Sequence, residues 1–134
     1  MEELINMKRS IIMSILLVFL SLVILTGCDN NIALLYSGSN IGNKINGSYK
    51  LFTGTRSKTI NIEKGKTILI DYSSEVNKGE LTMKIFDSDE KVALELDTNT
   101  SGSKELKSKN GGKYELIITG SKSDGNFSIK WDEK

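Results

Sequence analysis

A strict alternation of apolar and polar residues from Ser48 to the C-terminus is the feature that most constrains the fold of this chain. Side chains of an extended strand point to opposite faces in turn, so each alternating run places its apolar residues on one face. No helical period competes with this pattern. The runs are Ile60 and Ile62; Ile68, Ile70 and Tyr72; Leu81, Met83 and Ile85; Val92, Leu94 and Leu96; Tyr114, Leu116 and Ile118; and Phe127, Ile129 and Trp131.

Turn-forming residues separate these runs. The turn signals are Lys64-Gly65, residues 77–79, residues 87–90, residues 99–102, residues 110–112 and residues 124–126. Two sparser strands at residues 49–53 and 104–107 complete a prediction of about eight short antiparallel strands. Because each strand has one apolar face, we expect an all-β antiparallel sandwich of two sheets packed face to face, with a closed barrel as the alternative.

The N-terminus shows a different pattern. Residues 11–25 are apolar except for two serines, and Lys8 and Arg9 precede them. A helix of this length spans roughly 22 Å at about 1.5 Å per residue, which is less than the roughly 30 Å hydrocarbon core of a bilayer. We therefore interpret residues 1–27 as a signal peptide, with a single-pass membrane anchor as the weaker alternative.

The apolar block ends in Leu25, Thr26, Gly27 and Cys28. This order resembles the lipobox of bacterial lipoproteins. In that family the cysteine thiol receives a diacylglyceryl group, the chain is cut before the cysteine, and the new N-terminus is often acylated as well. The resemblance implies that Cys28 is the lipidation site and that the mature protein is anchored at the extracytoplasmic face of the cell membrane. A secreted protein with an incidental cysteine is the alternative.

Residues 28–47 are rich in Asn, Gly and Ser and lack a sustained apolar period. We predict that they form a lipidated flexible linker before a sandwich domain of residues 48–134. The nineteen residues after Cys28 would then reach roughly 25 Å and lift the domain off the lipid headgroups. In the alternative, residues 33–36 add a short edge strand or dip into the membrane interface.

Composition argues against several functional classes. Eighteen basic and seventeen acidic residues give a net charge of +1, which supplies no field for binding nucleic acid or an anionic membrane surface. With no histidine and one cysteine, the chain lacks the residues for a histidine-based triad, a Cys/His zinc site or an internal disulfide. Asp87, Asp89 and Glu90 share one turn, but without the glycine and distal glutamate of an EF-hand loop we interpret it as solvated. We expect no catalytic residue, metal or cofactor.

The segment KNGGKYELIITG, followed by GNFSIKW, resembles the closing strands of small bacterial jelly-roll modules such as pre-peptidase C-terminal domains. The resemblance implies that the antiparallel sandwich is jelly-roll-like, and that it is an accessory that binds or stabilises rather than a catalyst. We therefore expect a monomeric, lipid-anchored binding module whose partner is a protein or an envelope glycan. The alternatives are a protective or structural envelope lipoprotein, and a minimal envelope hydrolase that uses carboxylates such as Asp71, Glu75 and Glu80.

Three apolar residues are out of phase with their strands and are our candidates for a partner surface. Leu69, Phe86 and Ile117 each point away from the alternating set around them, and Ala93 could extend the group. An exposed cluster of such residues is typical of an interface, whereas cover by loops or by the linker is the alternative.

Overall fold

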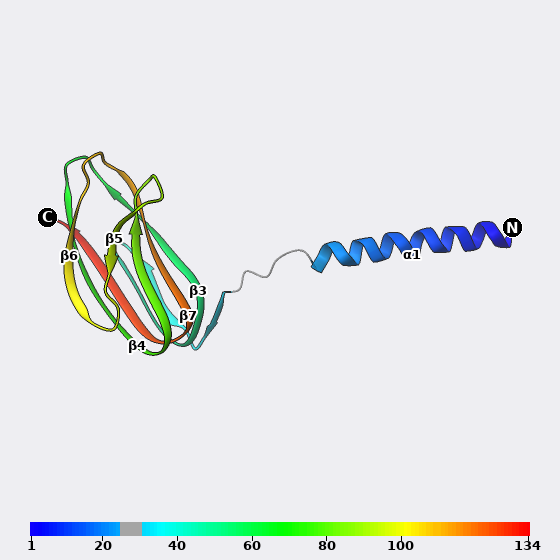
Figure 1. Cartoon of the computed structure of the whole chain (residues 1–134), viewed down its shortest axis with the longest axis horizontal. Helices are drawn as coiled ribbons and strands as arrows, with labels where there is room; N and C mark the ends of the chain where they lie inside the picture. Colours follow the sequence, from blue (N-terminus) through cyan, green and yellow to red (C-terminus); the bar gives the residue numbers. More distant parts are fainter. Residues whose placement is uncertain (25–30) are drawn as a thin grey trace.

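The computed structural model describes residues 1–24 and 31–134, so the predicted lipobox, including Cys28, lies outside the described residues. Helix α1 (Glu2–Ile24) precedes seven strands (Figure 1). The strands are β1 (Ile32–Leu34), β2 (Ser37–Ile41), β3 (Lys44–Ile62), β4 (Thr67–Phe86), β5 (Val92–Leu96), β6 (Ser101–Lys107) and β7 (Gly112–Glu133). Within the described ranges, no helix combines the length and the hydropathy that crossing a membrane requires.

Three long strands form the frame of the domain. Strands β3, β4 and β7 contain 19, 20 and 22 residues, and β7 pairs antiparallel with both of the others along nearly its whole length. The pairing shifts register within residues 49–54 of β3 and residues 76–80 of β4. There, and at residues 120–125 of β7, the strands turn back at one end of the domain (Figure 1). We call these three segments the bend.

The bend changes which residues of each strand face inward. In β4 the buried residues are Ile68, Ile70 and Tyr72 before the bend but Leu81, Met83 and Ile85 after it. The buried residues also change from odd to even positions in β3 and from even to odd positions in β7. A β-bulge inserts an extra residue into a strand and so reverses the side on which later side chains lie. Both halves of each long strand therefore contribute apolar residues to the same interior.

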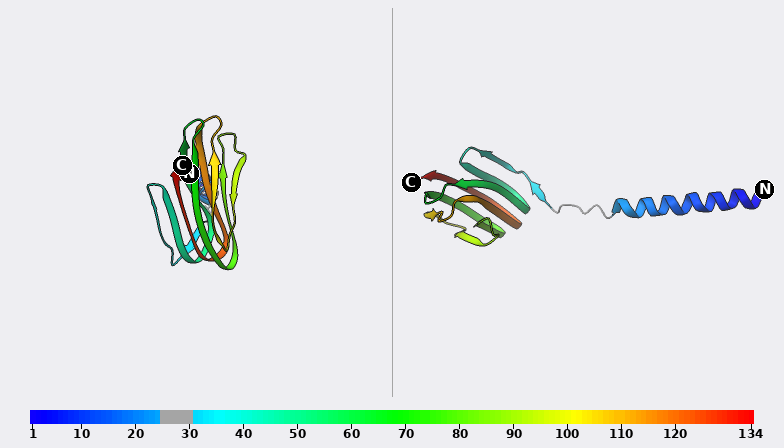
Figure 2. Two further views of the ribbon diagram at one scale, coloured as in Figure 1. Left: turned by 90° about the vertical axis from the view of Figure 1, so that its left-hand side faces the viewer. Right: turned by 90° about the horizontal axis from the view of Figure 1, so that it is seen from above.

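The domain consequently has two layers built largely from the same strands (Figure 2). One layer contains β2, the first half of β3, the second half of β7, the first half of β4, and β6. The other contains the remaining halves of the three long strands, with β5 at its edge. The core between them consists of Ile45, Tyr49, Phe52, Ile60, Ile62, Ile68, Ile70, Tyr72, Leu81, Met83, Ile85, Leu96, Leu106, Leu116, Ile118, Phe127, Ile129 and Trp131.

Glycines allow the strands to approach closely at the bend. A Cβ on Gly125 would lie 1.8 Å from the Glu75 carbonyl oxygen, and the φ of Gly125 is +154°. A Cβ on Gly120 would lie 2.4 Å from the Phe52 ring. Only a residue without a side chain fits either position, so both glycines are needed for the strands to bend from one layer into the other.

The predicted fold class, an antiparallel β-sandwich, is confirmed, but the number and limits of the strands differ. The segments at residues 77–79 and 124–126, which we predicted to be turns, are bends inside β4 and β7. The strand predicted at residues 49–53 is the middle of β3. Alternation stops at each of these places because of a register shift, and a local sequence pattern does not separate such a shift from a turn.

Residues 32–47 also differ from the flexible linker that we predicted. They form β1, β2 and the beginning of β3, and the Tyr36 side chain packs against the core. β1 pairs with residues 51–53, and all five residues of β2 pair with β3. Backbone pairing therefore orders a segment whose Asn, Gly and Ser content suggested a coil.

One buried tyrosine makes the stability of the fold depend on pH in the alkaline range. Tyr49 is 2% exposed, and its hydroxyl lies 3.5 Å from the buried Ser123 hydroxyl. Burial raises the pKa of Tyr49 above its ordinary value of 10.0, although the hydrogen bond with Ser123 partly opposes the rise. Folding thus favours the neutral phenol over the phenolate. The contribution of Tyr49 to the free energy of unfolding is therefore complete below about pH 10, and it is lost as the pH rises through the folded-state pKa.

We predict that the free energy of unfolding falls more steeply above about pH 10 in the wild type than in Tyr49→Phe, because the variant cannot ionise at this position. Urea titrations across the alkaline range measure this difference. Tyr114→Phe, which removes a hydroxyl from a half-buried ring, is the control. Parallel curves for the wild type and Tyr49→Phe would contradict the prediction.

Candidate functional site

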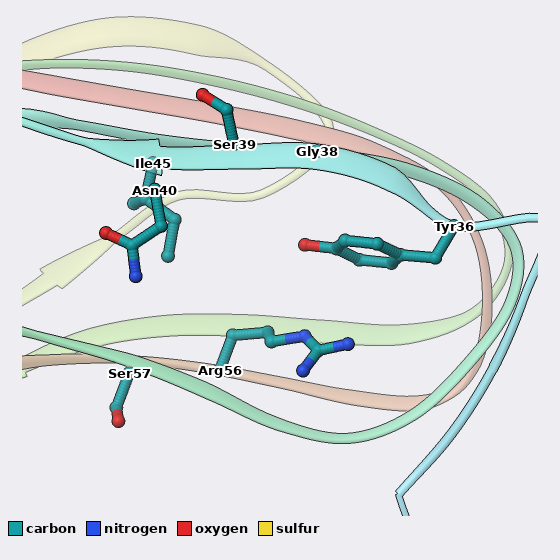
Figure 3. Close-up of a pocket in the computed structure, with 7 residues that line it drawn as sticks. All are labelled: Tyr36, Gly38, Ser39, Asn40, Ile45, Arg56 and Ser57. Atoms are coloured by element: carbon teal, nitrogen blue, oxygen red, sulfur yellow. The ribbon is translucent and has the colours of Figure 1, made fainter.

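A cleft opens where the two layers part along one edge of the domain. Strand β2 borders one layer there, and the second half of β3 borders the other. Between them lies a cavity of about 300 Å³, which we call the edge cleft (Figure 3). Its lining residues are Tyr36, Gly38, Ser39, Asn40, Ile45, Arg56 and Ser57.

The Tyr36 ring forms one end of the edge cleft. It lies over Gly38 and Gly47, which are cross-strand partners, and a Cβ on either glycine would come within 2.9 Å of the Tyr36 side chain. The ring also stacks on Tyr49 at a centroid separation of 6.1 Å and an interplanar angle of 6°. Because Gly38 and Gly47 lack side chains, there is room for the Tyr36 ring to pack over both strands.

The guanidinium of Arg56 covers the Tyr36 ring from the opposite layer. Its central carbon lies 4.7 Å from the Tyr36 ring centroid and 6.0 Å from that of Phe52. Arg56 pairs across the strands with the buried Ile118, which places it on the inward face of its layer. No carboxylate among residues 1–24 and 31–134 forms an ion pair with it. Arg56 is therefore a positioned cation whose charge is not compensated within the described structure.

Three polar groups converge in the edge cleft. The side chains of Tyr36, Asn40 and Arg56 point into it, whereas Ser39 and Ser57 point away from it (Figure 3). In the described part of the chain, no hydrogen bond engages the Tyr36 hydroxyl, the Asn40 amide or the Arg56 guanidinium. The guanidinium can donate to an oxyanion, while the amide and the phenol can both donate and accept. The arrangement can therefore hold an anionic ligand that also carries hydroxyl groups.

The structure does not bring the predicted partner surface together. Phe86 and Ile117 are diagonal neighbours on the outer face of one layer, since Phe86 pairs with Glu115 and Ile117 with Lys84. Leu69 lies on the outer face of the other layer, opposite Asp132 and Glu105. All three are half-buried, and Ala93 packs against the core instead of joining them. Leu69 and the pair Phe86 and Ile117 thus occupy separate surfaces.

Three of the acidic residues discussed above, Asp71, Glu75 and Asp87, accept hydrogen bonds within the domain. The Asp87 carboxylate accepts hydrogen bonds from the backbone N–H groups of Asp89 and Lys91, at 2.9 and 3.0 Å, and so caps its own turn. Asp71 accepts a hydrogen bond from Ser103, and Glu75 accepts one from Asn126. Where the structure is described, no cluster of His, Cys, Asp and Glu has the composition of a metal site.

Neither Tyr36 nor Arg56 was predicted from the sequence as a site residue. Tyr36 lies in the segment that we predicted to be a linker, and Arg56 lies in a polar stretch without apolar alternation. Two signals were present. Arg56 has the same parity as the buried Ile60 and Ile62, and Tyr36 is a lone aromatic residue close to Gly38 and Gly47.

Comparison with known proteins finds similarity in structure only. No protein-family model and no curated protein sequence matches the chain. The pre-peptidase C-terminal domain of collagenase from Bacillus anthracis is 22% identical over 69% of this chain and 90% of that domain, with a TM-score of 0.49. A structure of a CBM4 carbohydrate-binding module is 11% identical over 81% of each chain, with a TM-score of 0.48.

PliG from Aeromonas hydrophila, a periplasmic inhibitor of g-type lysozyme, is also similar. It is 13% identical over 66% of this chain and 84% of that protein, with a TM-score of 0.45. The similarity to all three structures is one of β-sandwich architecture.

We predict that the contact between Tyr36 and Arg56 is energetically coupled. A double-mutant cycle with Tyr36→Leu, Arg56→Gln and the double variant should give a coupling free energy of about 0.5–1 kcal/mol, the range found for cation–π pairs at exposed sites. Urea unfolding of the four proteins measures it. A coupling indistinguishable from zero would mean that the guanidinium does not rest on the ring in solution.

Proposed function

We propose that this protein is a lipid-anchored, non-catalytic binding module whose edge cleft binds an anionic sugar residue of an envelope glycan. The observation that carries the proposal is the Arg56 guanidinium, which lies over the Tyr36 ring, faces the edge cleft and has no acidic partner within the described chain. A guanidinium held over an aromatic ring can still donate its N–H groups to a carboxylate or a phosphate group.

The remaining groups of the edge cleft suit a sugar better than a bare anion. Asn40 and the Tyr36 hydroxyl can each donate and accept hydrogen bonds, as the hydroxyl groups of a sugar also do. Ile45, which is buried, supplies an apolar wall. A cavity of about 300 Å³ is at the lower end of the range for ligand pockets, which matches a single sugar residue or the end of a chain.

An inward-pointing charge on an edge strand also discourages pairing with another chain, and this is the competing explanation for Arg56. Lys58 separates the two explanations. It lies two residues along the same strand, pairs with the buried Leu116 and rests on Trp131, with 5.7 Å from its Nζ to the ring centroid, but it does not line the edge cleft. Protection of the edge needs both charges equally, whereas binding of a ligand needs Arg56.

Membrane attachment at the extracytoplasmic face is part of the proposal and rests on the lipobox resemblance at residues 25–28. Two acyl chains on Cys28 provide stable anchoring, since each buried CH₂ contributes about 0.8 kcal/mol. A tether of this kind raises the local concentration of the module beside envelope glycans, so a weak site is sufficient for function.

We predict that the domain binds glucuronate, glucose 6-phosphate or both at least about 10-fold more tightly than glucose, because a charged hydrogen bond to Arg56 contributes roughly 1.5 kcal/mol or more. Amide shifts in NMR titrations measure the three dissociation constants and locate the site. The two acids show whether the edge cleft prefers a carboxylate or a phosphate.

Arg56→Gln should remove the preference for the acids, while Lys58→Gln, with the same change in charge on the same strand, should reduce binding by less than about 3-fold because a screened surface charge contributes little. Arg56→Lys should be intermediate, because it keeps the charge but loses the planar group. Equal binding of acids and glucose, or equal effects of Arg56→Gln and Lys58→Gln, would reject the proposed site.

A further inference from the structure

Four exposed or partly exposed apolar residues gather beside the bend. Ile32, Leu34 and Leu35 are 52%, 55% and 81% exposed. Ile32 and Leu34 of β1 lie opposite Thr53 and Leu51 of β3, on the face away from the buried Phe52. Leu51 is half-buried and extends the group. We call Ile32, Leu34, Leu35 and Leu51 the β1 patch.

Two lysines flank the β1 patch. Lys50 is exposed and adjoins Leu51. Lys122 is also exposed, and its backbone N–H donates to the Thr53 hydroxyl at 3.0 Å, which places it beside the cross-strand partner of Ile32. Neither lysine forms an ion pair with another described residue. The net charge of +1 gives the whole chain no attraction to an anionic membrane, but exposed apolar side chains flanked by two local cations without ion-pair partners have the chemistry that binds an anionic lipid surface.

The position of the β1 patch in the chain brings it close to the proposed anchor. Only residues 29–31 separate Cys28 from Ile32. Asn31 is itself attached to the domain, because its side-chain oxygen accepts a hydrogen bond of 3.0 Å from the backbone N–H of Thr55. Three residue steps from Cys28 to Asn31 span at most about 10 Å. The headgroup layer of one leaflet is about 5–8 Å thick, so a lipid on Cys28 holds β1 at the membrane surface.

We propose that the β1 patch inserts into the lipid headgroup region and that the domain lies directly on the membrane instead of standing off on a flexible linker. This proposal rests on the lipid anchor at Cys28. It adds a second contact with the bilayer, which limits the rotation of the domain about its anchor. The edge cleft, with Tyr36 next to Leu35 in the chain, then opens close to the membrane surface.

The test uses the lipidated full-length product in vesicles of equimolar phosphatidylcholine and phosphatidylglycerol. An environment-sensitive fluorophore is attached at Leu35→Cys. The thiol of Cys28 does not react with the fluorophore, because it forms the thioether to the lipid. The matched control carries the fluorophore at Val92→Cys, which is 51% exposed on β5, at the opposite end of the sheet order from β1. We expect a blue shift of emission and quenching by doxyl-labelled lipids at position 35, and neither effect at position 92.

Each other outcome overturns the proposal in a different way. A fluorophore at position 35 that stays in water, on a protein whose intact mass shows lipid on Cys28, contradicts docking but leaves the anchor valid. A mass without lipid on Cys28 contradicts the anchor and the docking that rests on it, while binding in the edge cleft stays separately testable. A blue shift without quenching by doxyl-labelled lipids means that protein, such as a second copy, covers the β1 patch.

Discussion

The bend imposes the constraint on which the rest of the structure depends. In each long strand the apolar residues occupy positions of one parity before the bend and of the other parity after it, so both halves can face the same interior only if an extra residue is accommodated between them. The register shifts in β3 and β4 and the close approach at Gly120 and Gly125 make this change possible. Without the shift, the apolar residues of one half would face water, because a slip of one residue moves every later side chain to the other face.

The same constraint positions the edge cleft. Phe52 packs against Gly120 at the bend, and its ring lies 5.2 Å from that of Tyr49 and 6.3 Å from that of Tyr36. Tyr36 in turn supports Arg56. A chain of aromatic contacts thus connects the core of the bend to the polar groups of the edge cleft, and the guanidinium occupies a defined position although it is exposed.

Alternation within strands could be read from the sequence, and therefore so could the fold class and most of the core. The sequence could not show that several of these runs join into three long strands, because this depends on pairing between segments far apart in the chain. Tyr72 pairs with Ile129 and Met83 with Ile118, and only this long-range register shows that residues 77–79 continue β4. The edge cleft was missed for a related reason. Tyr36 is ordered by contacts with Gly38, Gly47 and Arg56 rather than by any local preference for a strand.

The most direct test of this account is the backbone pairing of β4 with β7 on both sides of the bend. Cross-strand nuclear Overhauser effects in the isotope-labelled protein measure it. The account predicts backbone contacts of Tyr72 with Ile129 and of Met83 with Ile118, together with slow amide exchange in both halves of β4. Contacts in one half only, or rapid exchange throughout residues 81–86, would show that β4 and β7 do not stay paired on both sides of the bend and would contradict the bent-strand architecture.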